Sequence, residues 1–258
     1  MFRHHAVAVV IPAFNEADKI TATIRSVPEF VDHVIVVDDG SGDATASEAR
    51  RAAGPGVEVI VHPENRGVGA AIATGYARAL ALGVEATAVM AGDGQMDPVD
   101  LSALLAPVVD GRADYAKGNR LAWAGGWRQI PLVRLGGSVV LSWLTRLATG
   151  YGQLSDSQCG YTVASRRALL AIGPERMFAR YGYPNDLLIR LAAVRARVVD
   201  VPVRPVYGAA WRSGLRPARV AVPIARLLAR AFIRRLLAGR AAGAAPSERD
   251  EAPCESAS

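Results

Sequence analysis

The chain has 258 residues, a length that suits one large α/β domain or one domain with an appendage. Hydrophobic residues make up 51% of it and charged residues 21%, a composition that excludes a wholly disordered protein. No uninterrupted apolar run approaches the ~18 residues that a membrane span requires. We therefore expect a folded chain that does not cross a bilayer.

The net charge of +6 is concentrated near the C-terminus. Residues 1–200 carry 20 basic and 20 acidic side chains, whereas residues 201–247 carry nine arginines and no acid. Residues 248–258 then carry one arginine and four acids. A local excess of positive charge indicates a local anionic partner. Because the rest of the chain is neutral and contains no recognition motif, we expect no nucleic-acid binding.

The cysteines and the first residues indicate the compartment. Cys159 and Cys254 have no metal-type spacing and form no disulfide framework, which favours a reducing cytoplasm. Residues 1–5 lead directly into a strand-like run, without the charged segment and long apolar stretch of a signal peptide. The sequence therefore predicts a cytoplasmic protein.

Short β-branched runs alternate with helical patterns in the first half of the chain. We expect strands at 7–11, 33–37, 57–61 and 86–90, and helices at 15–24, 43–53 and 68–82. Asn15 and Asp43 are the expected N-caps, and Asp97 before Pro98 predicts the start of another helix. This alternation predicts a mainly parallel, Rossmann-like sheet with helices on both faces.

The second half is less regular. We expect helices at 131–149, 185–196 and 218–237, and strands at 159–164 and 197–203. Pro223 is compatible with the last helix only near its first turn. The chain thus divides into a main domain over 1–210, a basic amphipathic helical segment over 211–240 and a disordered tail over 241–258.

Polar residues follow four successive predicted strands, at 12–16, 38–41, 65–70 and 93–95. The carboxyl ends of parallel strands meet at one edge of a sheet, where ligands bind, so we expect a small-molecule site there. The alternative is that these residues only form turns and caps. That alternative explains each loop singly, but it poorly explains acids after both the second and the fourth strand.

Three segments resemble family 2 glycosyltransferases in order and spacing: Ile-Pro-Ala-Phe-Asn-Glu at 11–16, Val-Asp-Asp-Gly-Ser at 37–41 and Asn-Arg-Gly-Val-Gly-Ala at 65–70. Lys-Gly-Asn-Arg at 117–120 and Asp-Ser-Gln-Cys-Gly-Tyr at 156–161 extend the resemblance to polyprenyl-phosphate sugar transferases, such as dolichol-phosphate mannose or glucose synthases. The resemblance implies an inverting enzyme of the GT-A fold. Its expected reaction moves a hexose from a UDP- or GDP-sugar to a dolichyl or undecaprenyl phosphate.

The resemblance also implies a nucleotide-sugar pocket. Its expected lining is Pro12, Asn15, Glu16, Asp38, Asp39, Gly67, Gly69, Asp93 and Lys117. A carboxylate at 38 or 39 can accept hydrogen bonds from a base imide or a ribose hydroxyl, and glycines allow the backbone to approach a diphosphate closely. The alternative, a dinucleotide-binding loop, lacks its third glycine because Ile72 stands there.

The expected metal motif departs from that of the family. Relatives usually carry Asp-any-Asp, often followed by Gln, whereas this chain has Ala91 in the first position and keeps Asp93 and Gln95. Oxygen ligands suit Mg²⁺ or Mn²⁺, and one carboxylate can suffice when substrate phosphates complete the coordination. We expect Asp93 and Gln95 to hold the ion. Asp97 is better explained as a helix cap, with a role as a metal ligand as the alternative.

Cations must meet the negative charge that gathers on the leaving diphosphate. Arg120 is the first candidate and Lys117 the second, although Lys117 can equally be a solvated residue at a sheet edge. The resemblance also implies that the acceptor side lies at 156–161, with Gln158, Gly160 and Tyr161 lining it.

The nature of the acceptor decides whether a general base is needed. A phosphate monoester arrives largely ionised, since its second pKa lies near ~6. A hydroxyl acceptor needs a carboxylate within reach, and Asp156 and Asp186 are the candidates. Asp186 has an alternative role as an acid favoured by the dipole at a helix N-terminus. Cys159 has no paired base nearby and is interpreted as a small packed residue.

The segment 218–237 places Arg219, Arg226, Arg230 and Arg234 along one helical face, with apolar residues over much of the remainder. Such a helix fits an in-plane anchor on anionic lipid at the inner face of the cell membrane. Trp123, Trp127 and Trp143 would add interfacial contacts. The alternative is a helix packed on its own domain with a solvated arginine face.

Two other functions remain open from the sequence. One is a soluble transferase that acts on a hydroxyl acceptor. The other is a non-catalytic nucleotide-binding protein, suggested by the missing aspartate at Ala91.

Overall fold

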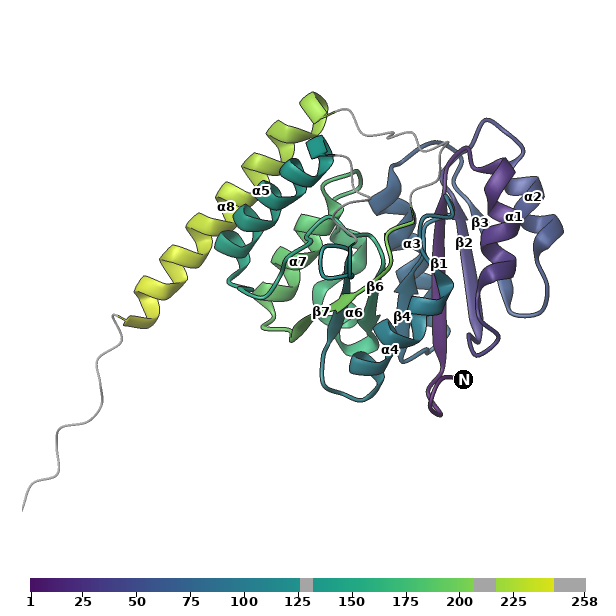
Figure 1. Ribbon diagram of the computed structural model, residues 1–258, viewed down its shortest axis with the longest axis horizontal. Helices are drawn as coiled ribbons and strands as arrows, with labels where there is room; N and C mark the ends of the chain where they lie inside the picture. The colour runs from purple at the N-terminus through teal and green to yellow at the C-terminus, as the bar shows by residue number, and fades with distance from the viewer. Residues whose placement is uncertain (126–131, 207–216, 244–258) are drawn as a thin grey trace, which may run out of the picture.

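The computed structural model describes residues 1–125, 132–206 and 217–243 (Figure 1). Its centre is a seven-stranded sheet in the order β3-β2-β1-β4-β6-β5-β7. The strands are β1 Val7–Ala13, β2 His33–Asp38, β3 Val57–Val61, β4 Ala86–Val89, β5 Tyr115–Asn119, β6 Thr162–Ser165 and β7 Val198–Pro202. Only β6 runs antiparallel to its neighbours within this sheet. The expected mainly parallel sheet is confirmed.

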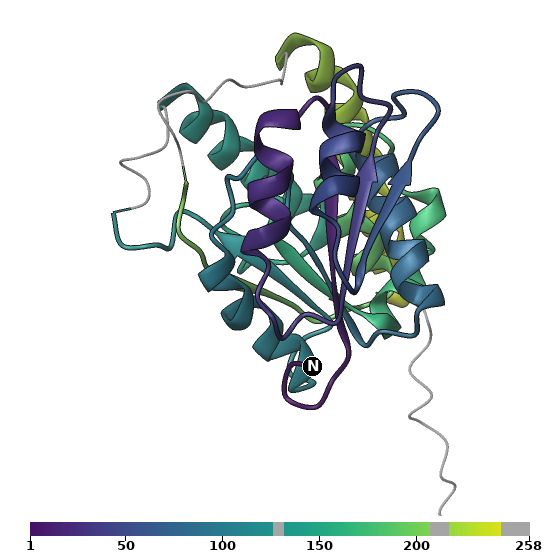
Figure 2. The same ribbon diagram turned by 90° about the vertical axis from the view of Figure 1, so that its right-hand side faces the viewer.

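Helices cover both faces of the sheet (Figures 1 and 2). They are α1 Ala17–Ser26, α2 Thr45–Ala52, α3 Val68–Ala81, α4 Leu101–Val109, α5 Leu132–Thr149, α6 Arg166–Ile172, α7 Tyr183–Ala193 and α8 Pro217–Gly243. Short 3₁₀ turns lie at Pro98–Asp100 and Pro174–Arg176. Buried residues of α1, α2 and α4 join one hydrophobic cluster, and those of α3, α6 and α7 join the other.

The alternation of β1 explains why both clusters form. Successive side chains of a strand point to opposite faces. Val9 and Ile11 belong to the cluster under α1 and α4, whereas Ala8 and Val10 belong to the cluster under α3. Every residue of β1 is buried, as expected for a central strand covered on both faces.

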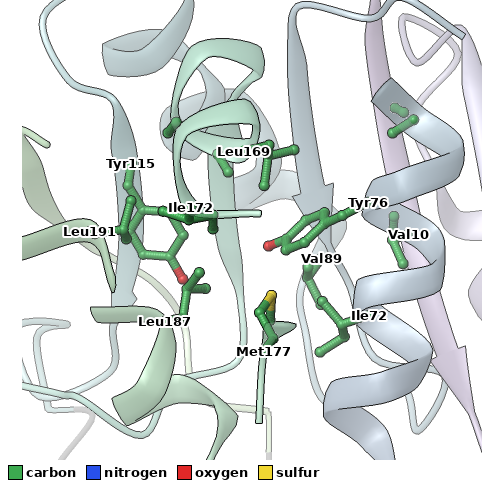
Figure 3. Close-up of a cluster of buried hydrophobic side chains, with 14 of the residues drawn as sticks. Val10, Ile72, Tyr76, Val89, Tyr115, Leu169, Ile172, Met177, Leu187 and Leu191 are labelled. Atoms are coloured by element: carbon green, nitrogen blue, oxygen red, sulfur yellow. The ribbon is translucent and has the colours of Figure 1, made fainter. Parts of the chain in front are cut away.

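The cluster on the α3 face contains large aromatic side chains (Figure 3). Tyr76 of α3 and Tyr115 of β5 are each no more than 1% exposed. In Figure 3 they extend toward each other across a space filled by aliphatic side chains, among them Leu169, Ile172 and Leu187. This core fixes α6 and α7 against the sheet.

Some expected boundaries were wrong. Asn15 does not cap α1, because the N-cap residue is Glu16 and Asn15 has a left-handed backbone with φ of 55°. The strand expected at 159–164 begins only at Thr162, and the helix expected at 185–196 begins at Tyr183 and ends at Ala193. The sequence analysis missed β5, because the lysine and glycine within it interrupt the apolar pattern.

Strand directions bring most of the expected site to one edge. Strands β1 to β4 and β5 end on the same side, because β4 and β5 both run antiparallel to β6. The segment that precedes β6, at 156–161, lies on that side for the same reason. The expected site therefore gathers at the carboxyl edge of the sheet.

The helices α5 and α8 run side by side, and α8 extends past the end of α5 (Figure 1). Ile224, Leu228 and Ala231 of α8 pack with Ala148 of α5 in a small cluster of their own. The helix includes residues 241–243, where the sequence analysis expected a disordered tail, and residues 244–258 lie outside the described residues. Within the described parts, no helix is both long and apolar enough to cross a membrane.

Candidate active site

The loops after β1 and β2 are joined by hydrogen bonds. The backbone N–H of Asn15 donates to the Ser41 hydroxyl at 2.9 Å, and Ser41 donates in turn to the buried Asp38 carboxylate. The Asn15 side-chain oxygen accepts from the N–H of Gly42 at 3.0 Å, and the N–H of Glu16 donates to Thr45 at 2.8 Å. Asn15 tolerates its left-handed backbone well. The two loops therefore form one rigid rim.

Asp39 joins the loop after β2 to the loop after β3 through hydrogen bonds inside the protein. One of its oxygens accepts from the N–H of Arg66 at 3.0 Å and lies 2.7 Å from Nδ1 of His62. The other accepts from the N–H of Gly67 at 2.7 Å. Asp39 is only 2% exposed. These contacts give Asp39 a role in fixing the start of α3.

Gly67 and Gly69, which were expected beside a ligand, pack closely against another part of the chain. A Cβ on Gly69 would overlap the carbonyl oxygen of Phe178, and a Cβ on Gly67 would lie 2.5 Å from the carbonyl oxygen of Ala179. The N–H of Ala70 donates to that Ala179 oxygen at 3.0 Å. The glycines thus let the N-terminus of α3 pack directly on the segment before α7.

The loop that carries Asp93 lies beside the Asp38–Asp39 turn. The N–H of Gly92 donates to Pro12 of β1 at 3.1 Å, and the N–H of Asp39 donates to Ala13 of β1 at 2.8 Å. The two acidic turns therefore flank the same end of β1.

The donor groups near Asp93 fit a weakly held metal ion. The Asp93 carboxylate accepts from the N–H of Gln95 at 3.0 Å, which orders the turn. Among the described residues there is no group of three or more His, Cys, Asp or Glu side chains that could hold an ion. A site built on Asp93 would therefore depend on substrate oxygens, a mode that Mg²⁺ commonly uses. Asp97 caps the turn at Pro98, as expected.

Arg120 and Asp156 form a buried pair. The guanidinium contacts both carboxylate oxygens, with Nε–Oδ2 at 2.7 Å and Nη2–Oδ1 at 3.0 Å. Asp156 is 1% exposed and Arg120 13%. Burial alone would raise the pKa of Asp156, but the hydrogen bonds and charge of Arg120 outweigh it and hold that pKa below its usual value.

Lys117 lies beneath this pair. Its side chain is 1% exposed, so the solvated position considered for it is wrong, and its ammonium donates to the carbonyl oxygen of Cys159. Burial lowers the pKa of Lys117, while nearby Asp156 and Asp200 oppose that shift. Cys159 is buried as expected, and burial raises the pKa of its thiol.

Asp200 and Asn119 belong to the same polar layer, and the sequence analysis missed both. The Asp200 carboxylate accepts from Asn119 at 2.9 Å and from the N–H of Ser155 at 2.8 Å. The Asn119 oxygen accepts from the N–H groups of Leu121 and Ala122. These bonds tie the loops that carry Arg120 and Asp156. The acid in β7 gave no sequence signal, because its partner lies 81 residues earlier.

Tyr183 connects the two sides of the site and was also missed. Its Cβ lies where a side chain on Gly69 would stand, and its hydroxyl lies 3.1 Å from the position of a Cβ on Gly160. Burial raises the pKa of Tyr183, and the Asp93 carboxylate adds to the shift. Tyr183 therefore spans from α3 to the expected acceptor segment, near Asp93.

The other expected acceptor residues have internal partners. Gln158 donates to Ser157 at 2.9 Å and to Asn185 at 3.2 Å. The Tyr161 hydroxyl donates to the carbonyl of Asp97 at 3.1 Å. The segment 156–161 is thus held between α7 and the Asp93 loop.

Asp186 is likewise engaged. Its carboxylate accepts from the N–H of Phe178 at 2.8 Å and from Nε of Arg190 at 2.7 Å. It stands in the first turn of α7 and is 6% exposed. These contacts match the helix-terminus role considered for it.

The model of Glycosyl transferase family 2 matches residues 8–173. The UDP-N-acetylglucosamine–dolichyl-phosphate N-acetylglucosaminyltransferase of Methanococcus voltae is 28% identical over 77% of this chain and 85% of that protein. The polyprenol monophosphomannose synthase of Mycolicibacterium smegmatis is 32% identical over 76% of this chain and 75% of that protein.

The fold also matches a solved structure. Glucosyl-3-phosphoglycerate synthase from Mycobacterium tuberculosis, crystallised with Mn²⁺, UDP and phosphoglyceric acid, superposes with a TM-score of 0.66 at 22% identity. The match covers 90% of this chain and 78% of that one. It establishes the likeness of the fold.

Proposed function

This chain belongs to Glycosyl transferase family 2 and is a glycosyltransferase of GT-A fold; we propose that it moves a hexose from a UDP- or GDP-sugar to a polyprenyl phosphate, with inversion at the anomeric carbon. The names of two relatives, which specify dolichyl phosphate and a polyprenol monophosphate product, support this acceptor class. The geometry of the carboxylates supports it independently.

The observation that carries the proposal is the pairing of both candidate bases. Asp156 is held by Arg120, and Asp186 is held by Arg190. A hydroxyl acceptor requires a carboxylate that is able to take a proton, but the Asp156 pKa is lowered and its oxygens already accept hydrogen bonds. A phosphate acceptor is largely ionised near pH 7 and needs little such help. The arrangement therefore favours a phosphate acceptor.

The donor would lie at the rim formed by the loops after β1, β2 and β4. Asp38 and the Pro12–Glu16 loop would contact the nucleoside, and Asp93 with Gln95 would hold Mg²⁺ or Mn²⁺ against the diphosphate. When bound, the ion supplies positive charge to the leaving group. Arg120 would supply further charge from the other side of the site, and Asp156 is then a positioning residue that orients its guanidinium.

The acceptor class requires a membrane surface. Large apolar side chains of both helices are exposed: Val139, Val140, Trp143, Leu144 and Leu147 on α5, and Val222, Phe232, Ile233, Leu236 and Leu237 on α8. Arg226, Arg230 and Arg234 accompany them on α8. Apolar and cationic side chains together favour docking to anionic lipid. We place the enzyme in the cytoplasm, at the inner face of the cell membrane. Trp127 and two arginines that precede the expected helix, Arg212 and Arg216, lie outside the described residues.

The direct test is a transfer assay. Purified protein is incubated with Mn²⁺, undecaprenyl phosphate and radiolabelled UDP- or GDP-hexoses, and organic-extractable label is counted. We expect lipid-linked product with one donor class. An Asp93→Asn variant should lose transfer by about 100-fold because a charged ligand of the diphosphate-bound ion is removed. Asp18→Asn, an exposed acid on α1, is the matched control.

Two outcomes would contradict the proposal. Product on a hydroxyl acceptor in place of the lipid would point to the soluble transferase considered above. Donor binding by calorimetry, without transfer or donor hydrolysis, would point to a non-catalytic protein.

A further inference from the structure

A pocket of about 400 Å³ lies between α7 and α8, apart from the Arg120–Asp156 pair. Its polar lining consists of Asp186 and Arg190 from α7 and Arg230 and Arg234 from α8. Apolar side chains, including Ile189 and Leu227, form the rest of its wall. The pocket thus combines several cations with an apolar surface.

The charge of the pocket is unbalanced. Arg190 is held by Asp186 and also donates to the carbonyl oxygen of Arg176. Arg230 and Arg234 make no ion pair with any acid in the described parts of the chain. The helix α8 contains no acidic residue at all. Two guanidinium groups therefore stand at the pocket without a compensating carboxylate, which is the charge pattern that a phosphate group complements.

The neighbours of these arginines indicate the kind of phosphate. On a helix, residues three or four apart are adjacent. Ile233 is adjacent to Arg230, and Leu237 is adjacent to both Arg234 and Ile233; the two apolar side chains are 55% and 59% exposed. A free phosphate or a nucleotide would leave these side chains in water, whereas the acyl chains of a lipid would cover them.

We infer that the α7–α8 pocket binds the phosphate of an anionic membrane phospholipid, while Ile233 and Leu237 enter the acyl region. This site differs from the expected acceptor site, since its lining includes neither Arg120 nor any residue of the 156–161 segment. It deepens the membrane-docking part of the proposed function by replacing diffuse charge attraction with a defined headgroup site. Asp186 would hold Arg190 in position at the wall of the pocket.

The test compares three single variants of the full chain that remove the same charge from the same helix. Arg230→Gln and Arg234→Gln alter the pocket, whereas Arg226→Gln removes an exposed arginine of α8 that does not line it. Partition of each variant into phosphatidylcholine vesicles that contain about 30% phosphatidylglycerol is measured by co-sedimentation. Vesicles of phosphatidylcholine alone, and inorganic phosphate as a soluble competitor, complete the comparison.

We expect each pocket variant to weaken binding to the anionic vesicles by at least about 10-fold, and Arg226→Gln by about 5-fold or less. Equal losses in all three variants would overturn the pocket in favour of diffuse attraction. Binding that does not depend on phosphatidylglycerol, or that inorganic phosphate abolishes at millimolar concentration, would overturn the lipid assignment.

The measurements distinguish a wrong assignment of this pocket from a wrong assignment of the transfer reaction. Transfer to a short-chain polyprenyl phosphate in detergent does not require vesicle docking, so the pocket variants should retain it. Vesicle binding, in turn, is measured without any sugar donor. Thermal unfolding of each variant confirms that the exposed substitutions leave the fold intact.

Discussion

Buried carboxylates at the carboxyl edge each have donors of their own. Asp39 accepts from two backbone N–H groups and contacts His62, and Asp156 accepts from Arg120. An unpaired buried charge is strongly unfavourable, so such groups persist only with partners. Asp200 is the exception in part, because its Oδ1 atom has no hydrogen-bond partner and burial raises its pKa.

Replacing Asp156 with Asn tests the Arg120–Asp156 pair. We expect Asp156→Asn to lower the free energy of unfolding by about 3 kcal/mol, because it removes a buried carboxylate that accepts hydrogen bonds from the Arg120 guanidinium. Transfer should fall while the pH profile of kcat keeps its shape, since Asp156 positions Arg120 and takes no proton. Urea unfolding and a pH series measure these effects. Loss of one limb of the profile would instead identify Asp156 as the general base.

The exposed pair of Arg3 with Asp110 provides the matched comparison. Both side chains are largely solvated, so Asp110→Asn should change neither stability nor transfer measurably.

Asp114 gives a pH-dependent contribution to stability. Although burial would raise its pKa, hydrogen bonds from Arg197 and Arg167 hold that pKa at about 2, below the ordinary 3.8. Between these values the unfolded chain binds more protons than the folded one, so this contribution is present above about pH 3.8 and disappears as the pH falls to about 2. The stability difference between wild type and Asp114→Asn should therefore shrink over that range in urea titrations. A constant difference would contradict the assignment.

At the scale of elements, the N-terminus of α3 is fixed by contact with the segment before α7. Gly67 has φ of 102°, and Gly69 packs against Phe178 and Tyr183. Asp39 holds the same turn from the other side. Tyr183, whose hydroxyl lies 3.1 Å from the position of a Cβ on Gly160, extends this packing to the segment 156–161.

The substitution Gly69→Ala should disturb the contact between the start of α3 and the segment before α7. The added Cβ would overlap the Phe178 carbonyl and lie 2.8 Å from the Tyr183 Cβ, so the 178–183 segment must move. We expect a stability loss of about 1–3 kcal/mol and a larger fall in transfer than in donor binding. Gly54→Ala, where a Cβ meets nothing within 4 Å, is the control. Unchanged transfer in Gly69→Ala would show that this contact does not set the site geometry.

At the scale of the whole molecule, the α5–α8 pair stands apart from the sheet and exposes apolar side chains (Figure 1). Ile224 and Leu228 of α8 pack with Ala148 of α5, and Thr145 of α5 accepts a hydrogen bond from Asn185 of α7. A large exposed apolar surface beside arginines is unusual for a protein that meets only water. We attribute it to lipid contact.

Trp143→Ser and Leu236→Ser test this surface. Their side chains are 56% and 52% exposed, so removal should not disturb the core. Each variant should weaken partition into anionic vesicles by about 5- to 30-fold, since the lipid-buried area is lost. Leu170→Ser on α6 removes a side chain that is 60% exposed and should have no effect on partition. Equal partition of all three variants into anionic vesicles would refute lipid contact through α5 and α8.

The sequence alone determined the strand–helix alternation, the mainly parallel sheet and the gathering of polar loops at one edge, because these depend on local periodicity and on strand direction. Only the tertiary structure decided which charges pair: Asp156 with Arg120, Asp186 with Arg190, and Lys117 with a backbone carbonyl. Partners such as Asn119 and Asp200 lie far apart in the chain, and no local pattern records the distance or burial that sets their pKa values. The same reason hid the pocket between α7 and α8.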